Sequence, residues 1–174
     1  MIKLRKIEPT DLPFLYQWEN DASAWSDGSN HNPLSQQDLR DYIASTSGDI
    51  YRDGQLRLIV ESVSIQHSAV SIQHSETLGC IDLFDFDPRN RRAAIGMYIA
   101  PECRGRGVGR EAVRLLEEYA FGHLNLRLIY AVIALSNHAC STIFRDAGFT
   151  ATQAIPEWTL KDSAQIWYKN NPDT

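Results

Sequence analysis

The residues with the clearest chemical purpose form a segment rich in glycine and arginine at 104–110, Arg-Gly-Arg-Gly-Val-Gly-Arg. A predicted strand leads into it, and it opens directly onto a predicted helix. At such a helix start the backbone N–H groups and the helix dipole favour an anion, and glycines let a phosphate come close. Arg104, Arg106 and Arg110 add positive charge. The segment therefore predicts a site for a phosphate-bearing ligand.

Other phosphate-binding loops fit this segment less well. A Walker loop needs Lys and Ser/Thr after its last glycine, where this chain has Arg110 and Glu111. The dinucleotide fingerprint needs Gly or Ala at position 110 and a place after the first strand of a parallel sheet, and both conditions fail. An RNA-binding Arg-Gly tract would be longer and would not open an amphipathic helix. A flexible loop with surface arginines is the structural alternative.

The elements around this loop are strands and helices in one continuous order. Ser35 and Asp38 form a capping box, and Thr10 and Asn137 are further candidate helix caps. Residues 128–135 are almost all apolar and predict a buried central strand. Hydrophobic periodicity predicts strands at 2–7, 55–61, 77–86, 93–100, 128–135 and 165–169, and helices at 11–20, from 36, at 108–121 and at 137–147. This order predicts a single α/β domain over 1–174, with a mixed sheet and helices packed on it.

Composition excludes several classes of protein. The 17 Lys and Arg against 22 Asp and Glu give a net charge of −5, which disfavours bulk attraction to nucleic acid. The three cysteines lack CxxC spacing, so reduced thiols and no metal site are expected. No apolar run reaches the length of a membrane span, and the first residues do not resemble a secretion signal. We expect a cytoplasmic protein without nucleic-acid or membrane partners.

One internal repeat interrupts the pattern, since Val-Ser-Ile-Gln-His-Ser occurs at 63–68 and again at 70–75. His67 and His74 could pair at a metal ion. The favoured interpretation is a duplication that lengthened a surface hairpin at 63–76, because neither copy adds a carboxylate or cysteine beside its histidine.

Two motifs in register resemble one known family. Residues 104–109 match the [QR]xxGx[GA] loop of the GNAT superfamily of N-acetyltransferases, and the run from Asn137 to Gly148-Phe149 resembles its second signature. The segments 4–11 and 18–21 are similar to the branch that holds ribosomal-protein N-terminal and spermidine acetyltransferases. The resemblance implies a GNAT-like fold with a mostly antiparallel sheet, splayed central strands and helices on both faces.

The resemblance also implies a reaction: an acetyl group passes from acetyl-CoA to a primary amine, by direct attack in a ternary complex. Main-chain groups at 97–99 would hold the pantetheine arm and polarise the thioester, and the glycine loop would hold the pyrophosphate. The residues expected to bind acetyl-CoA are Met97, Tyr98, Ile99, Arg104, Gly105, Arg106, Gly107, Val108, Gly109, Arg110, Asn137 and Phe144.

An alkylamine with a pKa near 10.4 is mostly protonated at neutral pH, so a base must remove a proton before attack. The candidate carboxylates are Glu19 near the end of the first helix and Asp82, Asp85 and Asp87 on or after the third strand. Asp85 is expected to leave the strand face that Asp82 occupies. Tyr98 is a further candidate for binding the acceptor or relaying a proton.

The sequence offers several candidates for the group that protonates the leaving thiolate. Many members of the family use a Tyr at the position of Phe144, and Phe has no hydroxyl. The role could pass to Ser141, Cys140 or Tyr98, or to solvent, since a thiol pKa is only about 8.5. Phe144 also raises an alternative, a noncatalytic sensor module that binds acyl-CoA. A second alternative is an unrelated α/β protein that binds another phosphate.

In the family that the chain resembles, the first two helices and their connection form the wall beside the acceptor, which we call the acceptor side. In this sequence that region carries negative charge. Between residues 20 and 53, two arginines stand against six aspartates, a net charge of −4. Such a surface would attract a polyamine, an aminoglycoside or a basic peptide terminus, and Trp18 and Trp25 could pack against an aliphatic cation. The expected partners are therefore acetyl-CoA and a small amine or a protein N-terminus, with a homodimer also open.

Overall fold

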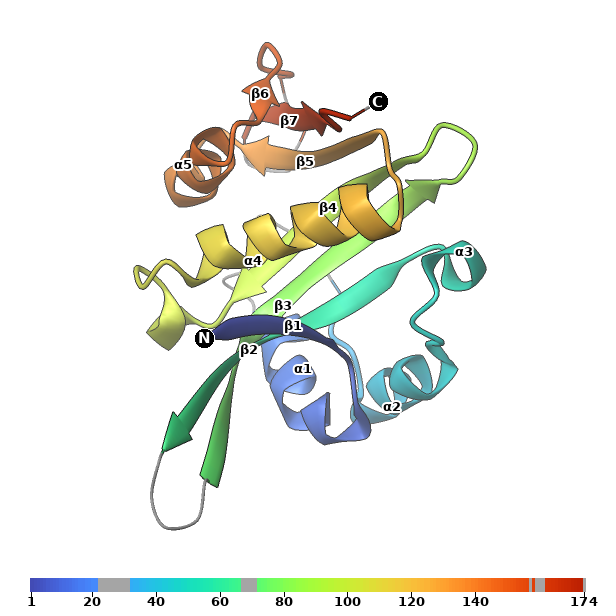
Figure 1. Cartoon of the computed structure of the whole chain (residues 1–174), viewed down its shortest axis with the longest axis vertical. Helices are drawn as coiled ribbons and strands as arrows, with labels where there is room; N and C mark the ends of the chain where they lie inside the picture. Colours follow the sequence, from blue (N-terminus) through green and yellow to red (C-terminus); the bar gives the residue numbers. More distant parts are fainter. Residues whose placement is uncertain (22–31, 67–71, 157, 159–161, 174) are drawn as a thin grey trace.

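The computed structural model describes residues 1–21, 32–66, 72–156, 158 and 162–173, which form one seven-stranded sheet with helices against it (Figure 1). The strands run in the order β1-β2-β3-β4-β5-β7-β6. Their bounds are β1 Ile2–Lys6, β2 Leu56–Gln66, β3 Ile72–Asp87, β4 Arg92–Ile99, β5 Leu128–Ala134, β6 Thr150–Ala151 and β7 Ala164–Asn170. The helices are α1 Leu12–Glu19, α2 Gln36–Ser45, α3 Ile50–Asp53, α4 Val108–Glu118 and α5 His138–Asp146.

The junction of β4 and β5 is the feature of the sheet that matters most for function. All other neighbouring strands pair antiparallel, whereas β4 and β5 run parallel. Their pairing covers three positions, from Arg92↔Leu128 to Ala94↔Tyr130, and no later pair joins them among the described residues. The expectation of a mostly antiparallel sheet with splayed central strands is confirmed.

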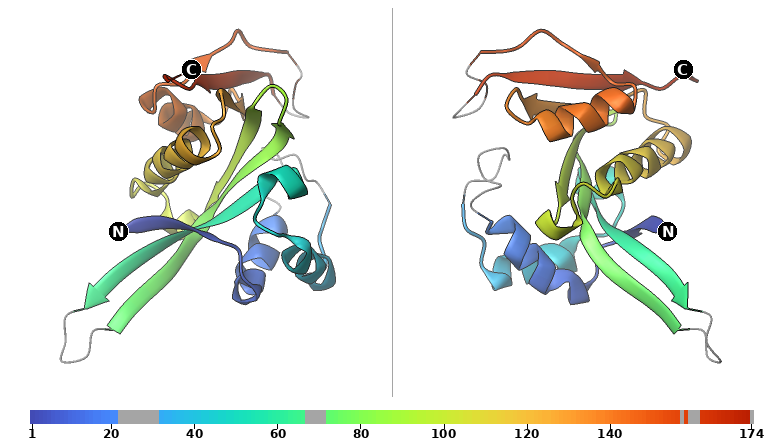
Figure 2. Two further views of the ribbon diagram at one scale, coloured as in Figure 1. Left: turned by 45° about the vertical axis from the view of Figure 1, so that its right-hand side comes forward. Right: turned by 90° about the vertical axis from the view of Figure 1, so that its left-hand side faces the viewer.

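The two faces of the sheet bury different sets of side chains because successive strand residues point to opposite sides. Val60 and Ile81 belong to the larger core, which includes buried residues of α4. Their neighbours Ile59 and Cys80 belong to a second cluster with residues of α1 and α2. Figure 2 shows α4 on the opposite side of β2–β4 from α1 and α2. We call these sides the α4 face and the α1 face.

Strand β5 differs from the prediction of a strand buried on both sides. Ile129, Ala131 and Ile133 are buried in the larger core, but Val132 is 39% exposed. Tyr130 and Val132 lie on the other face, where β5 has separated from β4 and a cleft opens. One side of the apolar run at 128–135 therefore packs in the larger core, and the other side forms part of the cleft wall.

Two of the three helix caps predicted from local sequence patterns are present in the structure. The Ser35 side chain accepts the Asp38 N–H and starts α2, and Asn137 accepts the Cys140 N–H and starts α5. The prediction of Thr10 as a cap is wrong, because Thr10 lies inside a 3₁₀ turn, Pro9–Asp11. There the buried Asp11 carboxylate binds the Glu8 N–H and both terminal nitrogens of Arg5, at 2.8 and 2.7 Å. A capping box between Glu8 and Asp11 therefore stands in place of a Thr10 cap.

The repeat lies on the hairpin formed by β2 and β3. Ser64 of the first copy pairs with His74 of the second, in antiparallel register. His67 lies outside the described residues. Within the part of the chain that the structure describes, no group of three or more His, Cys, Asp or Glu is arranged to hold a metal ion. No described helix is long and apolar enough to cross a membrane.

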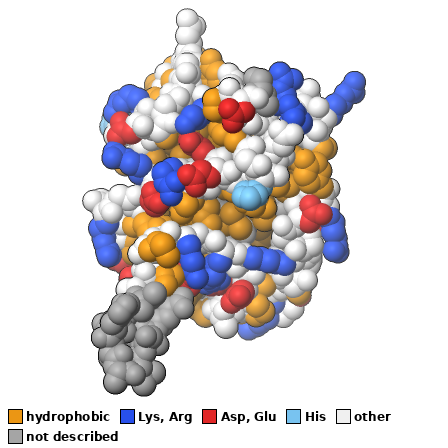
Figure 3. Space-filling model, viewed as in Figure 1, with side chains coloured by type: hydrophobic (Ala, Val, Ile, Leu, Met, Phe, Trp, Pro, Cys, Tyr) orange, Lys and Arg blue, Asp and Glu red, His pale blue; other side chains and the backbone are white. Residues whose placement is uncertain are grey.

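The view of the α4 face in Figure 3 shows basic and acidic side chains interspersed, with apolar side chains exposed between them. A shallow depression of about 480 Å³ lies between β1 and the end of α4, lined in part by Leu4, Leu58 and Leu115. The larger hollow is the cleft at β4 and β5.

Candidate active site

A cleft of about 1930 Å³ opens where β4 and β5 separate. It is lined from the α4 face by the start of α4 and by α5, and from the α1 face by residues of α1, α2 and β2. The glycine loop therefore borders the same space as residues of α1 and α2, the helices expected on the acceptor side. None of the described aspartates between residues 20 and 53 lines this space.

The glycine loop presents its backbone to this cleft. Gly105 and Gly107 have φ of 72° and 80°, the left-handed region that residues with a Cβ rarely adopt. No other atom lies within 4 Å of the position where a Cβ would stand on either glycine. Gly107 is the N-cap of the 11-residue helix α4. The loop thus combines an open approach with the positive end of a helix dipole, which suits a pyrophosphate.

The three arginines of the loop have different surroundings. Arg104 donates from Nε to a main-chain carbonyl at the end of β4 at 2.8 Å, and its guanidinium lies 5.7 Å from the ring centre of Tyr98. Arg110 forms an ion pair with Asp146 of α5 at 2.6 Å. Both line the cleft, as do Gly105, Gly107, Val108 and Gly109, whereas Arg106 does not.

Gly109 has a packing role of its own. A Cβ on Gly109 would lie 2.9 Å from Cδ1 of Ile143 and 3.4 Å from Cε of Met97. The absent side chain therefore lets α4 approach both α5 and β4. Gly109, the third glycine of the motif, therefore allows close helix packing, whereas Gly105 and Gly107 leave space for a ligand.

Residues at the splay border the space where a pantetheine arm would run. Met97, Tyr98 and Ile99 line the cleft from β4, and Asn137 lines it from the start of α5. The Asn137 side chain caps α5 by accepting the Cys140 N–H at 3.1 Å. The predicted position of this asparagine beside the arm and its role as a cap are compatible.

Two candidate positions on α5 give no proton donor to the cleft. Phe144 lines the cleft but is only 1% exposed, because it packs edge-on against Phe149 with ring centres 4.8 Å apart. Ser141 is not among the lining residues, and its hydroxyl donates to the carbonyl of His138 at 3.1 Å. Cys140 does line the cleft.

The acceptor side contains a residue that the sequence analysis missed, Arg57. Its Nε and Nη2 donate to the two carboxylate oxygens of Asp82, at 2.9 and 2.8 Å. Its Nη1 donates to Glu19 at 2.5 Å. All three side chains are only about one-fifth exposed and all three line the cleft. Two of the predicted carboxylates, from α1 and β3, are thus held together by one guanidinium from β2.

This cluster has an excess of negative charge, because one guanidinium faces two carboxylates. Burial raises the pKa of Asp82, and the charge of Arg57 only partly offsets that effect. Burial alone would lower the pKa of Arg57, but Asp82 and Glu19 outweigh it and raise the pKa further. Arg57 therefore stays charged, while Asp82 titrates closer to neutral pH than an ordinary aspartate.

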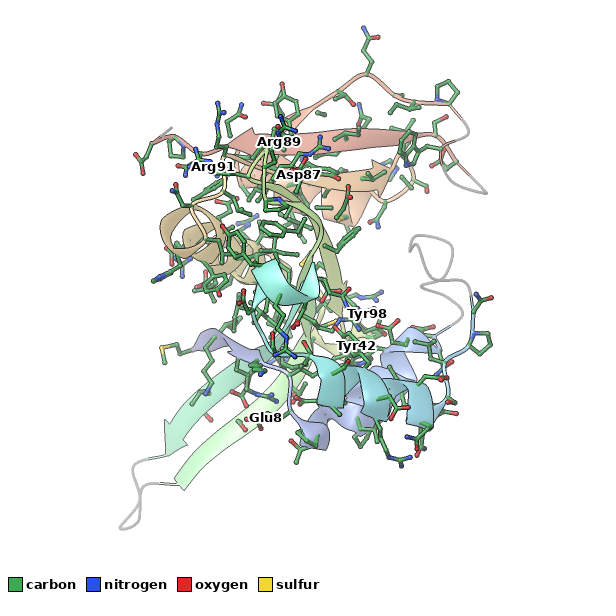
Figure 4. The ribbon with its side chains drawn as sticks, turned by 90° about the vertical axis from the view of Figure 1, so that its right-hand side faces the viewer. Glu8, Tyr42, Asp87, Arg89, Arg91 and Tyr98 are labelled. Carbon is green, nitrogen blue, oxygen red and sulfur yellow. The ribbon has the colours of Figure 1, made fainter. Side chains whose placement is uncertain are left out.

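Tyr98 is held by contacts on the α1 face, which Tyr42 reaches from α2 (Figure 4). The Tyr98 hydroxyl donates to Oδ2 of Asp21 at 3.1 Å, and its ring packs 5.6 Å from that of Trp18. Burial and the neighbouring carboxylate of Asp21 raise the pKa of Tyr98 to about 12. Tyr98 is therefore protonated at neutral pH and cannot serve as a base there.

Asp85 and Asp87 have different positions. Asp87 accepts hydrogen bonds from the backbone and side chain of Asn90 at the turn after β3, and it does not line the cleft. Figure 4 shows Asp87 beside Arg89 and Arg91, far from Tyr98. Asp85 does line the cleft.

Comparisons with known proteins agree with this geometry. The profile described as an acetyltransferase (GNAT) domain matches residues 2–150. Spermidine N(1)-acetyltransferase of Escherichia coli (strain K12) is 28% identical over 152 residues, covering 86% of this chain and 73% of the relative. A ribosomal N-acetyltransferase-like protein of Bacillus subtilis (strain 168) is 37% identical over 71 residues, 41% of this chain and 39% of the relative.

A solved structure resembles the whole described fold. The spermidine N-acetyltransferase from Vibrio cholerae, in complex with CoA and spermine, superposes with a TM-score of 0.83 at 22% sequence identity. The match covers 98% of this chain and 95% of that one. At this identity the likeness shows that the two chains share a fold.

Proposed function

The chain belongs to the GNAT family of acetyltransferases and transfers the acetyl group of acetyl-CoA to an amine, and on that premise we propose that its acceptor is a small polyamine-like cation. The observation that carries the proposal is the Arg57 cluster, in which Glu19 and Asp82 share one guanidinium inside the cleft. The excess negative charge favours an ammonium group over a neutral or anionic acceptor. The similarity to spermidine acetyltransferases supports the same class.

Acetyl-CoA is proposed to enter from the glycine loop. Its pyrophosphate would lie against the backbone of Gly105 and Gly107, whose Cβ positions are open. Its pantetheine arm would occupy the space between β4 and β5, which lack pairing beyond Ala94 and Tyr130. Main-chain groups of β4 that the splay leaves unpaired would then polarise the thioester carbonyl.

Asp82 is the proposed base. Its Oδ2 lies 3.7 Å from the place where a Cβ would stand on Gly96, so this carboxylate leans over a floor that has no side chain. Asp82 would take a proton from the bound ammonium, and the neutral amine would attack the thioester carbon. The new C–N bond forms as the C–S bond breaks and the sulfur leaves as the thiolate. The amine nitrogen releases its second proton to water in the cleft, and the thiolate takes a proton from the same water.

The leaving thiolate needs no tyrosine in this scheme. Phe144 cannot donate a proton and the Ser141 hydroxyl donates to His138. Solvent entering the open cleft can protonate the thiolate, since a thiol with a pKa of about 8.5 is a moderate leaving group near neutral pH.

Thiol release from acetyl-CoA tests the proposal, measured with spermidine, a neutral amide, an aminoglycoside and a basic peptide as acceptors. We expect turnover with spermidine, and a loss of about 10²–10⁴-fold in Asp82→Asn, the range for removing a general base. Asp87→Asn, outside the cleft, is the matched control. Turnover with the peptide alone would favour a protein N-terminus instead, and CoA binding without thiol release on any acceptor would favour the acyl-CoA sensor.

A further inference from the structure

We propose that Asp85 and Tyr130 bind a second ammonium group of the acceptor, so that the cleft selects amines with two cationic centres. This inference rests on the proposed function, because it assigns the far end of the same acceptor. In this inference Asp85 and Tyr130 determine which acceptors bind well, and they take no part in acetyl transfer itself.

The first argument is the shape of the cleft floor on the α1 face. Strand register places Asp82 beside Gly96 on β4, and one row further Phe84 beside Ala94. Ala94 in turn pairs with Tyr130 of β5, in the last row before β4 and β5 separate. The middle of the floor is therefore made of two small residues, Gly96 and Ala94, and both line the cleft between the Arg57 cluster and Tyr130.

Phe84 offers an apolar surface for an alkyl chain beside this part of the floor. Phe84 is 38% exposed and lines the cleft, and its Cε1 lies 3.3 Å from the place where a Cβ would stand on Gly96. The ring therefore lies partly over Gly96, and an extended methylene chain in the cleft would pack along the exposed side of this ring. A linear acceptor with its reacting amine at Asp82 would then direct its other end toward Tyr130.

The second argument is the position of Asp85. In a regular strand residue 85 would face away from Asp82 and Phe84, but the register of β3 and β4 shifts between Phe84 and Asp87. Asp85 has a φ of 48°, and its carboxylate accepts the hydroxyl of Tyr130. A bulge of this kind re-aims a side chain, here from the core side to the cleft.

The third argument is charge. Arg92, the nearby cation that lines the cleft, forms its ion pair with Asp87 at 3.5 Å. Asp85 forms no ion pair with any residue that the structure describes. A neutral hydroxyl therefore orients Asp85 without cancelling its charge, and the carboxylate can still bind an ammonium.

The spacing of the two anionic positions defines the acceptor. Asp82 and Asp85 are three residues apart on β3, so their Cα atoms are at most about 10 Å apart at the usual rise per residue. A diamine or polyamine with a spacer of several methylene groups spans such a distance. A monoamine of equal length would leave Asp85 without an ammonium partner.

The experiment compares two acceptors with the same number of heavy atoms, 1,6-diaminohexane and heptylamine, by thiol release from acetyl-CoA. The measured quantity is the ratio of kcat/KM for the diamine to that for the monoamine. We expect this ratio to be about 20 to 200 in the wild type, the factor of two that equivalent amines supply multiplied by the contribution of Asp85. Asp85→Asn should lower it by about 10- to 100-fold, as for loss of a charge-assisted hydrogen bond.

The variants are matched to the local structure. Asn tolerates a left-handed backbone as well as Asp does, so Asp85→Asn removes charge without adding backbone strain. Tyr130→Phe keeps the ring and removes the hydroxyl that orients Asp85, and should lower the ratio less. Glu118→Gln removes a carboxylate charge from the exposed side of α4, outside the cleft, and should leave the ratio unchanged. Unfolding midpoints of all variants check that they fold.

Two failures are distinguishable. If the wild type acetylates both amines but Asp85→Asn keeps the wild-type ratio, or if the wild type shows no preference for the diamine, the assignment of Asp85 and Tyr130 is wrong and the proposed function stands. If no amine supports thiol release, the proposed function and this inference both fall.

Discussion

Arg57 holds both carboxylate oxygens of Asp82, at 2.9 and 2.8 Å, and at the same time holds Glu19 through its remaining terminal nitrogen. One cation from β2 thus fixes the place of two carboxylates that come from β3 and α1. The arrangement gives the acceptor side its net charge and its geometry together.

Replacing Arg57 should therefore cost stability as well as acceptor binding. In Arg57→Met two partly buried carboxylates lose their common partner, which should lower the free energy of unfolding by about 3–5 kcal/mol, as for breaking a buried ion pair. Denaturant unfolding measures this loss. Arg57→Lys keeps the charge but not the two-pronged contact, and should lie between the wild type and Arg57→Met. A wild-type unfolding curve for Arg57→Met would contradict the buried cluster.

Asp82 should give the reaction a pH dependence that its variant lacks. Its pKa is raised by burial, so it becomes protonated at a higher pH than an ordinary aspartate. Only the deprotonated form is a base, so the advantage in kcat/KM of the wild type over Asp82→Asn should shrink as the pH falls through this pKa. Dividing the two profiles cancels the ionisation of the acceptor amine, which is the same in both.

Glu19→Gln is the companion measurement for that profile. It removes the other carboxylate bound by Arg57 and leaves the proposed base in place, so the acidic limb of the pH profile should remain. If the ratio of wild type to Asp82→Asn is flat with pH, while Glu19→Gln loses the acidic limb, the base is Glu19.

Gly107→Asp should abolish CoA binding. The substitution puts a side chain and a negative charge into the open space beside the start of α4, where the pyrophosphate is proposed to lie. Calorimetry with CoA measures the effect. Gly54→Asp is the control, since Gly54 also has a left-handed φ, 70°, and open space around it, but does not line the cleft. Both variants should lose about 1–2 kcal/mol of stability from the strained backbone, and only Gly107→Asp should lose CoA. Equal CoA affinity in the two variants would show that the loop does not bind the pyrophosphate.

Gly79→Ala should destabilise the sheet beside the site. A Cβ on Gly79 would lie 2.2 Å from the backbone oxygen of Tyr98, so β3 and β4 would have to move apart. Overpacking of this kind costs about 1–3 kcal/mol or more in the free energy of unfolding. Gly122→Ala, with nothing within 4 Å of its new Cβ, should be neutral or stabilising by up to about 1 kcal/mol. Equal unfolding free energies in the two variants would mean that β3 and β4 are less closely apposed at Gly79.

Short-range patterns predicted much of the fold. The caps at Ser35 and Asn137 depend on residues three positions apart, and both are present. The Thr10 cap failed because a 3₁₀ turn, Pro9–Asp11, precedes α1 and is capped by Glu8 and Asp11, which places Thr10 inside the turn. The short elements α3 and β6 were missed because four and two residues are too few to show a period.

The sequence by itself determined the glycine loop and the family, because both depend on short motifs whose spacing is visible along the chain. The splayed sheet was predicted only through the resemblance to that family. Only the tertiary structure decided which charges meet in the cleft. Arg57 meets Asp82 and Glu19 across separations of 25 and 38 residues, so their contact depends on strand register and on where α1 packs. Asp85 reaches Tyr130 only because a bulge turns it, and strand periodicity alone places it on the other face.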